Sequence, residues 1–349
     1  MQWSIAKAFP GTVLCLAVVL SACAGDGSDP AEDTLQAALL TSGPVSDAGW
    51  YAGAYEGLLL IEDSLGAQVS HQQTATPAEF DEAFLAYGSS GYDLIFAHGF
   101  EYQDAAIRAG SRFPDATIVV SGGGRVADNV VPLIFRLEEG SYLAGMAAGT
   151  LTQAGIVGMG GGGAIPPARG TFVAFEAGVR AVNPDIEVLE TFTGDWNDVS
   201  AAKEAAVAQL SRGADVIIHN LDAASFGVFQ AVREAVADGR RVRAIGMNSD
   251  QNDVAPDVII GSAVIYIPQA FLETARRWEA GNVGGEPIYA SIREGVIDFV
   301  FNPELLGELP EGLVQEIADA RDQIRSGELE VPRVRFVEGD DDPPSGGSE

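Results

Sequence analysis

The side chains that could do chemistry lie where the chain leaves short apolar runs. Two of them are tryptophans: Trp50 follows a glycine-rich turn, and Trp196 lies in the polar stretch 193–198. The faces of two such rings could stack on a flat heteroaromatic ligand. Other residues with similar placement could form the wall of a site or bind the edge of its ligand: Asp47, Tyr51, Gly99, Phe100, Ser121, Asp222, Asn248 and Asp250.

Each candidate also has a structural interpretation. Trp50 could pack at the start of a helix, and Phe100 could fill a wall of the core. The polar candidates could instead cap a helix or hold a turn: Asp47, Asp222, Asn248 and Asp250. His98 is expected to form a local hydrogen bond more than to contact a ligand. The residues alone leave both interpretations open.

Residue types that catalysis needs are scarce at these positions. No nucleophile–base pair follows the apolar runs, and a total of three histidines argues against a histidine-based zinc site. The one dense group of carboxylates, Asp340-Asp341-Asp342, lies in the C-terminal tail. The sequence therefore predicts a binding protein and not an enzyme, without a metal or a cofactor.

The glycine run 158–163 matches the G-x-G-x-x-G pattern of dinucleotide sites. The acidic residue that such a site needs is not convincing at the next strand end, and Pro166-Pro167 is expected to break the helix that the motif must open. The run is better suited to close approach of the backbone to a ligand or to a facing lobe. The sequence has no G-x-x-x-x-G-K-[ST], so we do not expect this chain to hydrolyse ATP.

Short apolar runs alternate with helical patterns, which is typical of a parallel sheet covered on both faces. Two such series predict an α/β fold with two doubly wound lobes, in which ligands bind beyond the carboxyl ends of the strands. Strands are expected at 35–40, 93–97, 116–120, 155–159, 186–190, 214–218 and 242–246, and helices at 50–65, 103–112, 201–212 and 225–238.

The N-terminus has the pattern of an export signal. Lys7 precedes the apolar run 13–20, which is too short to span a bilayer, and small residues lead to Cys23. Leu20-Ser21-Ala22-Cys23 resembles the lipobox of bacterial lipoproteins, which implies a signal peptide at 1–22 and a lipid on Cys23. The acidic, apolar-poor stretch 23–33 is then a flexible tether. We expect the protein on the extracytoplasmic face of the cell membrane, anchored through Cys23.

The charge of the chain limits its partners. Asp and Glu exceed Lys and Arg by 50 to 20, which gives a net charge of −30. Phosphate backbones need basic residues, so nucleic acid is excluded as a partner.

The length of the chain favours two lobes. Removal of residues 1–22 from 349 leaves 327, more than a single hydrophobic core usually serves. Residues 338–349 read as a disordered acidic tail.

Segments at the expected strand ends resemble the basic membrane protein family of substrate-binding lipoproteins of ABC transporters. Their order and spacing carry the resemblance over nearly all of the mature chain: 43–50 with 55–57, 113–115, 138–145, 178–184, 196–198, 213–217 and 245–251. The resemblance implies a type I periplasmic-binding-protein fold with three crossovers and lobes that close on the ligand. It assigns residues 34–135 and about 265–295 to the N-terminal lobe, and 136–264 and about 296–337 to the C-terminal lobe. Hinge strands are expected near 134–137, 262–266 and 296–301.

Known members of this family bind purine bases or nucleosides between aromatic rings, and the resemblance places those rings at Trp50 and Trp196. Three departures concern polar groups of nucleoside binders: Ser121 and Asn248 replace Asp, and Ile265 replaces Lys. Loss of that Lys removes hydrogen bonds to sugar hydroxyls, which favours a free purine base or a related heterocycle. The expected partners are this small molecule and an ABC permease, with the protein as a monomer. A sensor that presents the same binding core to a membrane receptor is the alternative.

Overall fold

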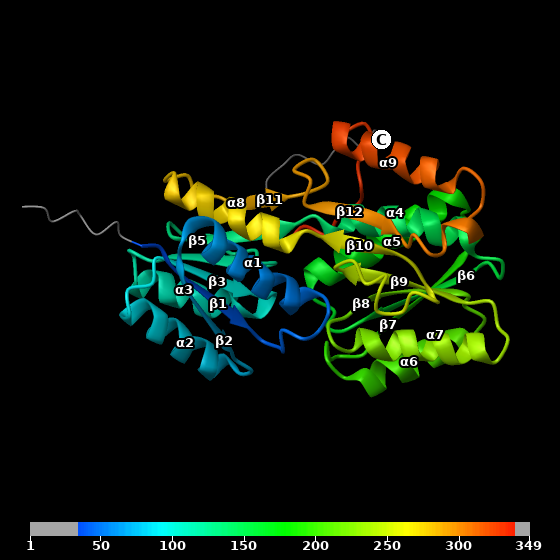
Figure 1. The fold of residues 1–349 in the computed structure, drawn as a ribbon, viewed down its shortest axis with the longest axis horizontal. Coiled ribbons are helices and arrows are strands. Elements are labelled where there is room, and N and C mark those ends of the chain that lie inside the picture. Colours follow the sequence, from blue (N-terminus) through cyan, green and yellow to red (C-terminus); the bar gives the residue numbers. More distant parts are fainter. Residues whose placement is uncertain (1–33, 339–349) are drawn as a thin grey trace, which may run out of the picture. The chain divides into compact units, whose positions relative to one another are not determined.

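The computed structural model describes residues 34–338, and from residue 35 onward the described chain forms one compact unit (Figure 1). The predicted signal peptide, Cys23 and the tether lie outside the described residues, as do residues 339–349 of the predicted tail. Glu338, which was assigned to that tail, is part of the described structure, and its backbone N–H donates to the carbonyl oxygen of Gly124 at 2.7 Å.

Two six-stranded sheets form the framework. The first has the order β11-β5-β4-β3-β1-β2 and is parallel throughout. The second has the order β12-β10-β9-β8-β6-β7, in which only β12 runs antiparallel to its neighbour. The first sheet contains β1 (Gln36–Thr41), β2 (Gln68–Gln73), β3 (Leu94–His98), β4 (Thr117–Ser121), β5 (Val130–Phe135) and β11 (Ile288–Ala290). The second contains β6 (Ile156–Gly161), β7 (Glu187–Phe192), β8 (Val216–Asn220), β9 (Arg243–Asn248), β10 (Ile259–Ile265) and β12 (Ile297–Phe301).

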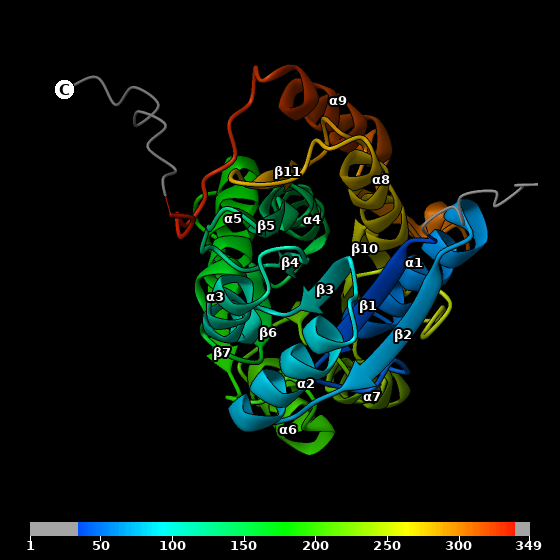
Figure 2. The ribbon, with the colours of Figure 1, turned by 90° about the vertical axis from the view of Figure 1, so that its left-hand side faces the viewer.

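Helices cover both faces of each sheet, and we call a sheet with its helices a lobe. In the first lobe, α1 (Trp50–Leu65) and α8 (Ile267–Glu279) pack together on one face, and α2 (Pro77–Ser89) and α3 (Gln103–Arg112) on the other (Figure 2). In the second lobe, α4 (Leu137–Leu151), α5 (Pro166–Val182) and α9 (Leu313–Ser326) lie opposite α6 (Val199–Ser211) and α7 (Ser225–Ala237). Burial of both faces explains why the central strands are almost entirely apolar. The predicted fold, with two doubly wound lobes, is confirmed.

The chain passes between the two sheets three times. The links are Arg136 between β5 and α4, Tyr266 between β10 and α8, and residues 291–296 between β11 and β12. The first two fall inside the expected hinge segments. The third expectation, near 296–301, shares only Val296 with the crossover: residues 297–301 form β12, which pairs with β10, and the turn before β12 makes the crossover. Ile265, expected in the first lobe, is the last residue of β10 in the second sheet.

The strands extend past the apolar runs that predict them. β3 ends at His98, β4 at Ser121, β8 at Asn220 and β9 at Asn248, so these polar residues belong to the strands instead of following them. Backbone hydrogen bonds continue to the edge of each sheet whatever the side chain, whereas the apolar pattern stops where the core stops. A polar side chain at a strand end therefore marks the edge that faces a site.

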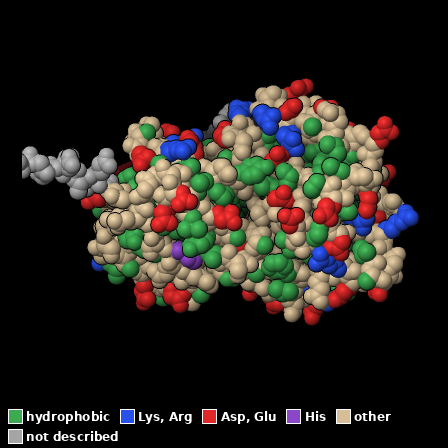
Figure 3. Space-filling view, in the orientation of Figure 1, with side chains coloured by type: hydrophobic (Ala, Val, Ile, Leu, Met, Phe, Trp, Pro, Cys, Tyr) green, Lys and Arg blue, Asp and Glu red, His purple; other side chains and the backbone are tan. Residues whose placement is uncertain are grey.

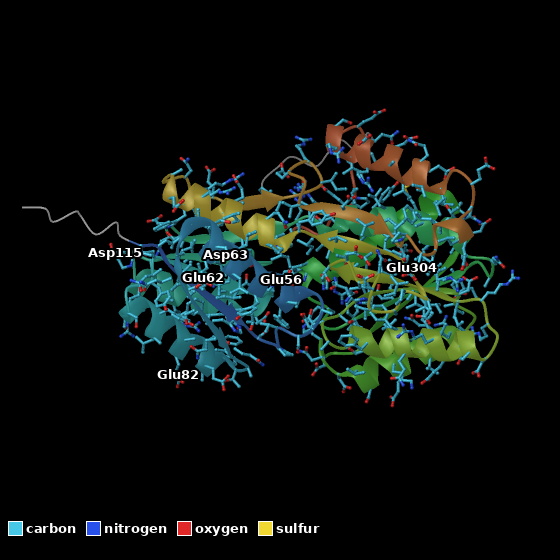
Figure 4. The ribbon with its side chains drawn as sticks, in the orientation of Figure 1. Glu56, Glu62, Asp63, Glu82, Asp115 and Glu304 are labelled. Carbon is cyan, nitrogen blue, oxygen red and sulfur yellow. The ribbon has the colours of Figure 1, made fainter. Side chains whose placement is uncertain are left out.

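Carboxylates dominate the surface. Figure 3 shows acidic side chains spread over the displayed face, with fewer basic ones. Figure 4 labels six exposed examples, on α1, on α2 and in connecting segments: Glu56, Glu62, Asp63, Glu82, Asp115 and Glu304. Within residues 34–338, no helix is long and apolar enough to cross a membrane, and no group of three His, Cys, Asp or Glu side chains could hold a metal ion.

Candidate functional site

A cavity of about 510 Å³ opens at the carboxyl ends of both sheets. Each sheet reverses its strand order once, between β1 and β3 in the first lobe and between β6 and β8 in the second. Such switch points leave a crevice at the carboxyl ends, and ligands of open α/β sheets bind there. Residues from both switch points line the cavity: Ser42, Gly99, Phe100 and Glu101 from the first lobe, and Asn220 and Asp222 from the second.

Trp50 is held as one wall of this cavity. Its ring stacks on His98, with centroids 3.8 Å apart, and meets the Phe135 ring edge-on at 5.8 Å. Burial lowers the pKa of His98 to about 3, so the imidazole is neutral at physiological pH. Its Nε2–H donates to the carbonyl oxygen of Trp50 at 3.0 Å. His98 thus fixes both the ring and the backbone of Trp50, which agrees with its expected local role.

Asp47 positions the helix that Trp50 begins. Its carboxylate accepts hydrogen bonds from the backbone N–H groups of Gly49, Tyr51 and Ala52, at 3.2, 2.8 and 2.8 Å. These donors have no partner within the helix, so Asp47 has the role of a capping residue. Asp47 is completely buried and does not line the cavity. The structure therefore supports the capping interpretation of Asp47.

Trp196 lines the cavity from the second lobe. Its carbonyl oxygen accepts from the N–H groups of Asp222 and Ala224, both at 3.1 Å, which ties its loop to the loop after β8. The ring lies against the glycine run: a Cβ atom on Gly162 would be 2.4 Å from the indole, and one on Gly163 3.2 Å. Gly162 and Gly163 make room for Trp196 of the same lobe, whereas the run was expected to allow close approach to a ligand or a facing lobe.

Pro166 and Pro167 correct another expectation about this glycine run. They begin α5 instead of breaking it. Proline suits the first turn of a helix because its missing N–H would have no partner there. The segment is therefore strand, glycine loop and helix, although the loop is filled by an indole ring.

A polar cluster joins the two lobes inside the cavity. The Ser42 hydroxyl hydrogen-bonds the Tyr51 hydroxyl at 2.8 Å and donates to the Glu101 carboxylate. Asp222, from the other lobe, is only 6% exposed. Burial is the main cause that raises the pKa of Tyr51, and the negative charge of Asp222 raises this pKa further. Burial also raises the pKa of Asp222, and the charges of Asp47 and Glu101 raise it further, while the Tyr51 hydroxyl lowers it. Tyr51 is therefore a neutral donor among acids.

The charged side chains that line the cavity are all acidic. Among its described lining residues the carboxyl groups are Glu101, Glu138, Asp195 and Asp222, and none is Lys or Arg. Burial raises the pKa of Glu101 and of Glu138, the latter against the opposing charges of Arg136 and Arg333. Like charges repel in a site of low dielectric, so an anionic ligand is disfavoured. The wall suits a neutral or cationic ligand that donates hydrogen bonds.

Seven of the ten predicted ligand residues line the cavity: Trp50, Tyr51, Gly99, Phe100, Trp196, Asp222 and Asn248. Asp47, Ser121 and Asp250 do not. Ser121 is completely buried at the end of β4, and its Oγ has no hydrogen-bond partner among the described residues. Asp250 is exposed, and its carboxylate accepts from the Asn252 N–H at 3.0 Å, as a turn residue does.

Asn248 has an unusual backbone. Its φ is 73°, a left-handed value that few residues other than glycine adopt, while its side chain is almost completely buried. Its Nδ2 donates to the carbonyl oxygen of Leu221 at 3.5 Å, a weak bond that leaves most of the amide's capacity free. Strained residues cluster at ligand sites, where the surrounding structure holds them.

Sequence reasoning missed several lining residues. Glu101 lies one position beyond the predicted Phe100, and Asn220 is the last residue of β8, so both had a local signal. Glu138 stands just after the first crossover, where hinge segments border the cavity. Phe336 also lines the cavity, from the far end of the chain, and nothing near it in the sequence indicates a site.

Comparisons with known proteins identify relatives that match most of the chain. The chain is 26% identical over 306 residues to a purine-binding protein of Brucella abortus (strain 2308), which covers 87% of this chain and 84% of the relative. It is 25% identical over 323 residues to a putative ABC transporter glucose-binding protein of Haloferax volcanii, which covers 91% of this chain and 79% of the relative.

A crystal structure of an ABC transporter solute-binding protein from Aeropyrum pernix K1 has the same fold. It superposes with a TM-score of 0.76 at 23% identity and covers 85% of this chain and 92% of its own. The family model of PnrA-like ABC transporter substrate-binding proteins matches residues 34–335. Members of this family bind a small-molecule substrate for a permease and are not enzymes, and the resemblance seen in the sequence is confirmed. The chain belongs to the PnrA-like family of ABC transporter substrate-binding proteins.

Proposed function

We propose that the protein binds a purine base, or a heterocycle related to purine nucleosides, in the cavity between its lobes and delivers it to an ABC permease. The observation that carries this proposal is that Trp50 and Trp196, from different lobes, line the same cavity. Each ring is backed on one side by its own lobe, through His98 and through Gly162. Two such rings can hold a flat π system by stacking on its faces.

The acidic wall complements the edge of a purine. Purines carry ring N–H groups and exocyclic amino groups, and carboxylates are strong acceptors for such donors. Asp222 and Glu101 are placed to accept them, and the amides of Asn220 and Asn248 can both donate and accept. A phosphorylated nucleoside would bring its negative charge into this wall, so we propose a ligand without phosphate.

A free base is favoured over a nucleoside. Ile265 lines the cavity at the position where the family resemblance places the Lys of nucleoside binders. An apolar side chain there cannot hydrogen-bond a ribose hydroxyl, and a buried hydroxyl without a partner costs affinity. The same reasoning applies to a hexose, the ligand named for the Haloferax relative.

We propose that export and a lipid on Cys23 place this binding activity at the membrane. The sequence pattern around Cys23 supports this part of the proposal. An anchored receptor has a raised effective concentration near its permease. Because Cys23 precedes the compact unit that contains the cavity, a Cys23→Ala protein is expected to bind ligand normally.

Isothermal titration calorimetry with adenine, guanine, adenosine, guanosine and glucose tests the ligand. We expect binding of a base, lost in Trp50→Ala and in Trp196→Ala, because each removes one stacking surface. Trp278→Phe is the matched control, since Trp278 donates from Nε1 to Thr117 at 3.0 Å and does not line the cavity. Tight nucleoside binding without base binding would refute the base preference, and binding of glucose alone would refute the purine proposal.

A further inference from the structure

The segment after α9 makes a fourth connection between the lobes. Leu329 and Val331 still pack against a hydrophobic core to which both lobes contribute, and the Val334 N lies 3.7 Å from where a Cβ on Gly170 of α5, in the second lobe, would stand. Glu338 then bonds the first lobe at Gly124. Figure 2 shows this segment, in red, descending from α9 toward the side of α5. We call residues 329–338 the strap.

The strap is fastened to the first lobe at one short stretch. The Glu338 N–H donates to the Gly124 carbonyl at 2.7 Å, and the Val126 N–H donates to the Glu338 carboxylate at 3.4 Å. Arg125 pairs with Glu338 at 3.3 Å and with Asp104 at 2.7 Å. A Cβ on Gly124 would lie 2.4 Å from the Phe336 carbonyl oxygen, so only glycine allows this approach.

Between the two lobes, the strap places an aromatic side chain in the wall of the cavity. Phe336 is half-buried, lines the cavity and meets the Phe100 ring at 6.3 Å between centroids. Arg333 of the strap acts on the same cavity, since its charge opposes the rise of the pKa of Glu138. The strap therefore contributes a side chain to the cavity, although none of the predicted ligand residues lies in the strap.

The fastening is weaker than the three crossovers. It consists of a few hydrogen bonds and exposed ion pairs, and exposed ion pairs contribute little because water screens them. The crossovers are continuous backbone. A motion that separates the lobes would release the strap from Gly124 before it strained the crossovers.

We propose that Phe336 is a ligand-contacting residue and that the strap is a gate whose release from Gly124 admits the ligand. This inference rests on the proposed function, because the gate serves the same cavity. Phe336 adds an aromatic contact beside Phe100 that any bound ring system would meet. Its removal should both weaken binding and speed release, since the contact exists only while the strap is fastened.

Two variants of the full-length protein test the strap from its two sides. Phe336→Ala removes the side chain, and Gly124→Ala displaces the strap without changing it. Gly307→Ala is the matched control, because a Cβ there would meet nothing within 4 Å. With adenine or guanine as the probe, we expect both variants to bind about tenfold more weakly and to release the base faster, with the control unchanged. Wild-type affinity and release in both variants would overturn the inference.

A readout without ligand separates this inference from the proposed function. Hydrogen exchange should show protected amides at Val126 and Glu338 in the wild type and in Gly307→Ala, and faster exchange in Gly124→Ala. In a Trp3→Phe/Trp278→Phe background, which leaves Trp50 and Trp196 as the tryptophans, acrylamide should quench the fluorescence more in Gly124→Ala than in the control. If the wild type binds no base, the proposed function fails. Hydrogen exchange and quenching then still show whether the contact at Gly124 holds the strap over the cavity. Equal exchange and quenching in Gly124→Ala and the control would overturn it.

Discussion

The Ser249 hydroxyl of the second lobe donates a hydrogen bond of 2.7 Å to the carbonyl oxygen of Ala48 in the first. Gln251 Nε2 donates to the same oxygen at 3.3 Å. Ala48 presents this carbonyl from a left-handed backbone conformation, with φ of 55°, in the loop that leads into Trp50. The loop that carries one aromatic wall is thus bonded directly to the opposite lobe, beside Asn248.

Ser249→Ala is expected to weaken base binding about fivefold, because a hydrogen bond that holds the lobes together contributes on the order of 1 kcal/mol. The fold should be unchanged, since the bond lies outside both sheets. Calorimetry compares the affinity of this variant for the base with that of Ser64→Ala, a control substitution on the exposed face of α1. Equal affinities in the two variants would mean that this bond does not support the binding conformation.

Gly162→Ala is expected to weaken base binding at least tenfold. The new methyl group would lie 2.4 Å from the indole of Trp196, and the ring would have to leave its place in the wall. Gly160→Ala, two positions earlier in β6, is the control, because a Cβ there meets nothing within 4 Å. Circular dichroism should show both variants folded. A Gly162→Ala protein with normal affinity would show that the position of Trp196 is not needed.

Asp222→Asn is expected to weaken binding and to stabilise the fold. The pKa of Asp222 is raised in the folded state, so the ionised carboxylate destabilises that state at pH above its folded pKa. That cost disappears as the pH falls below the ordinary pKa of the acid. The melting temperature of the variant should therefore exceed that of the wild type at pH 8 and approach it at pH 4.

The control for Asp222→Asn is Asp115→Asn, at an exposed position labelled in Figure 4. It should leave both affinity and melting temperature unchanged. A lower melting temperature for Asp222→Asn at pH 8 would show that the carboxylate is stabilised where it stands, in contrast to its raised pKa.

Glu139 makes the stability of the crossover region depend on pH. Its carboxylate accepts from the Ile292 N–H of the third crossover at 2.7 Å, and burial, with the charge of Glu138, raises its pKa to about 7. Because the folded pKa lies above the unfolded value of about 4.5, stability is lost as the pH rises from about 4.5 through 7. Glu139→Gln keeps an acceptor and removes the charge. We expect its melting temperature to exceed that of the wild type by roughly 2–4 °C at pH 8 and to match it at pH 4.

Differential scanning calorimetry from pH 4 to pH 8 measures this effect. Glu82→Gln, on the exposed side of α2 in Figure 4, should follow the wild-type curve. A gain for Glu139→Gln that is equal at both ends of the range would contradict the titration of Glu139.

The sequence predicted much of the framework because local patterns determine it. The bounds of α1 and α3 follow from their flanking residues, and the apolar runs located seven of the strands. β2 escaped notice because its sequence, Gln-Val-Ser-His-Gln-Gln, is polar: it is an edge strand that pairs only with β1. β12 was taken for a hinge because an apolar run does not reveal which strand it pairs with.

The site was predictable where its residues follow strands. Trp50, Trp196 and Asp222 have this placement, and all three line the cavity. Asp47 and Asp250 also follow strands, and only the structure shows that their carboxylates accept hydrogen bonds from nearby backbone N–H groups. Phe336 could not be found, because its position depends on the path of the strap and on the space left by Gly124, which are long-range properties of the fold.

Native mass spectrometry tests the central claim most directly. The full-length protein is mixed with equal concentrations of adenine, guanine, adenosine, guanosine and glucose, and the mass of the bound species is read. The paired tryptophans and the acidic wall predict a complex with one purine base, which disappears in the Trp50→Ala/Trp196→Ala double variant. A complex with glucose alone, or a base complex that survives in the double variant, would contradict the account.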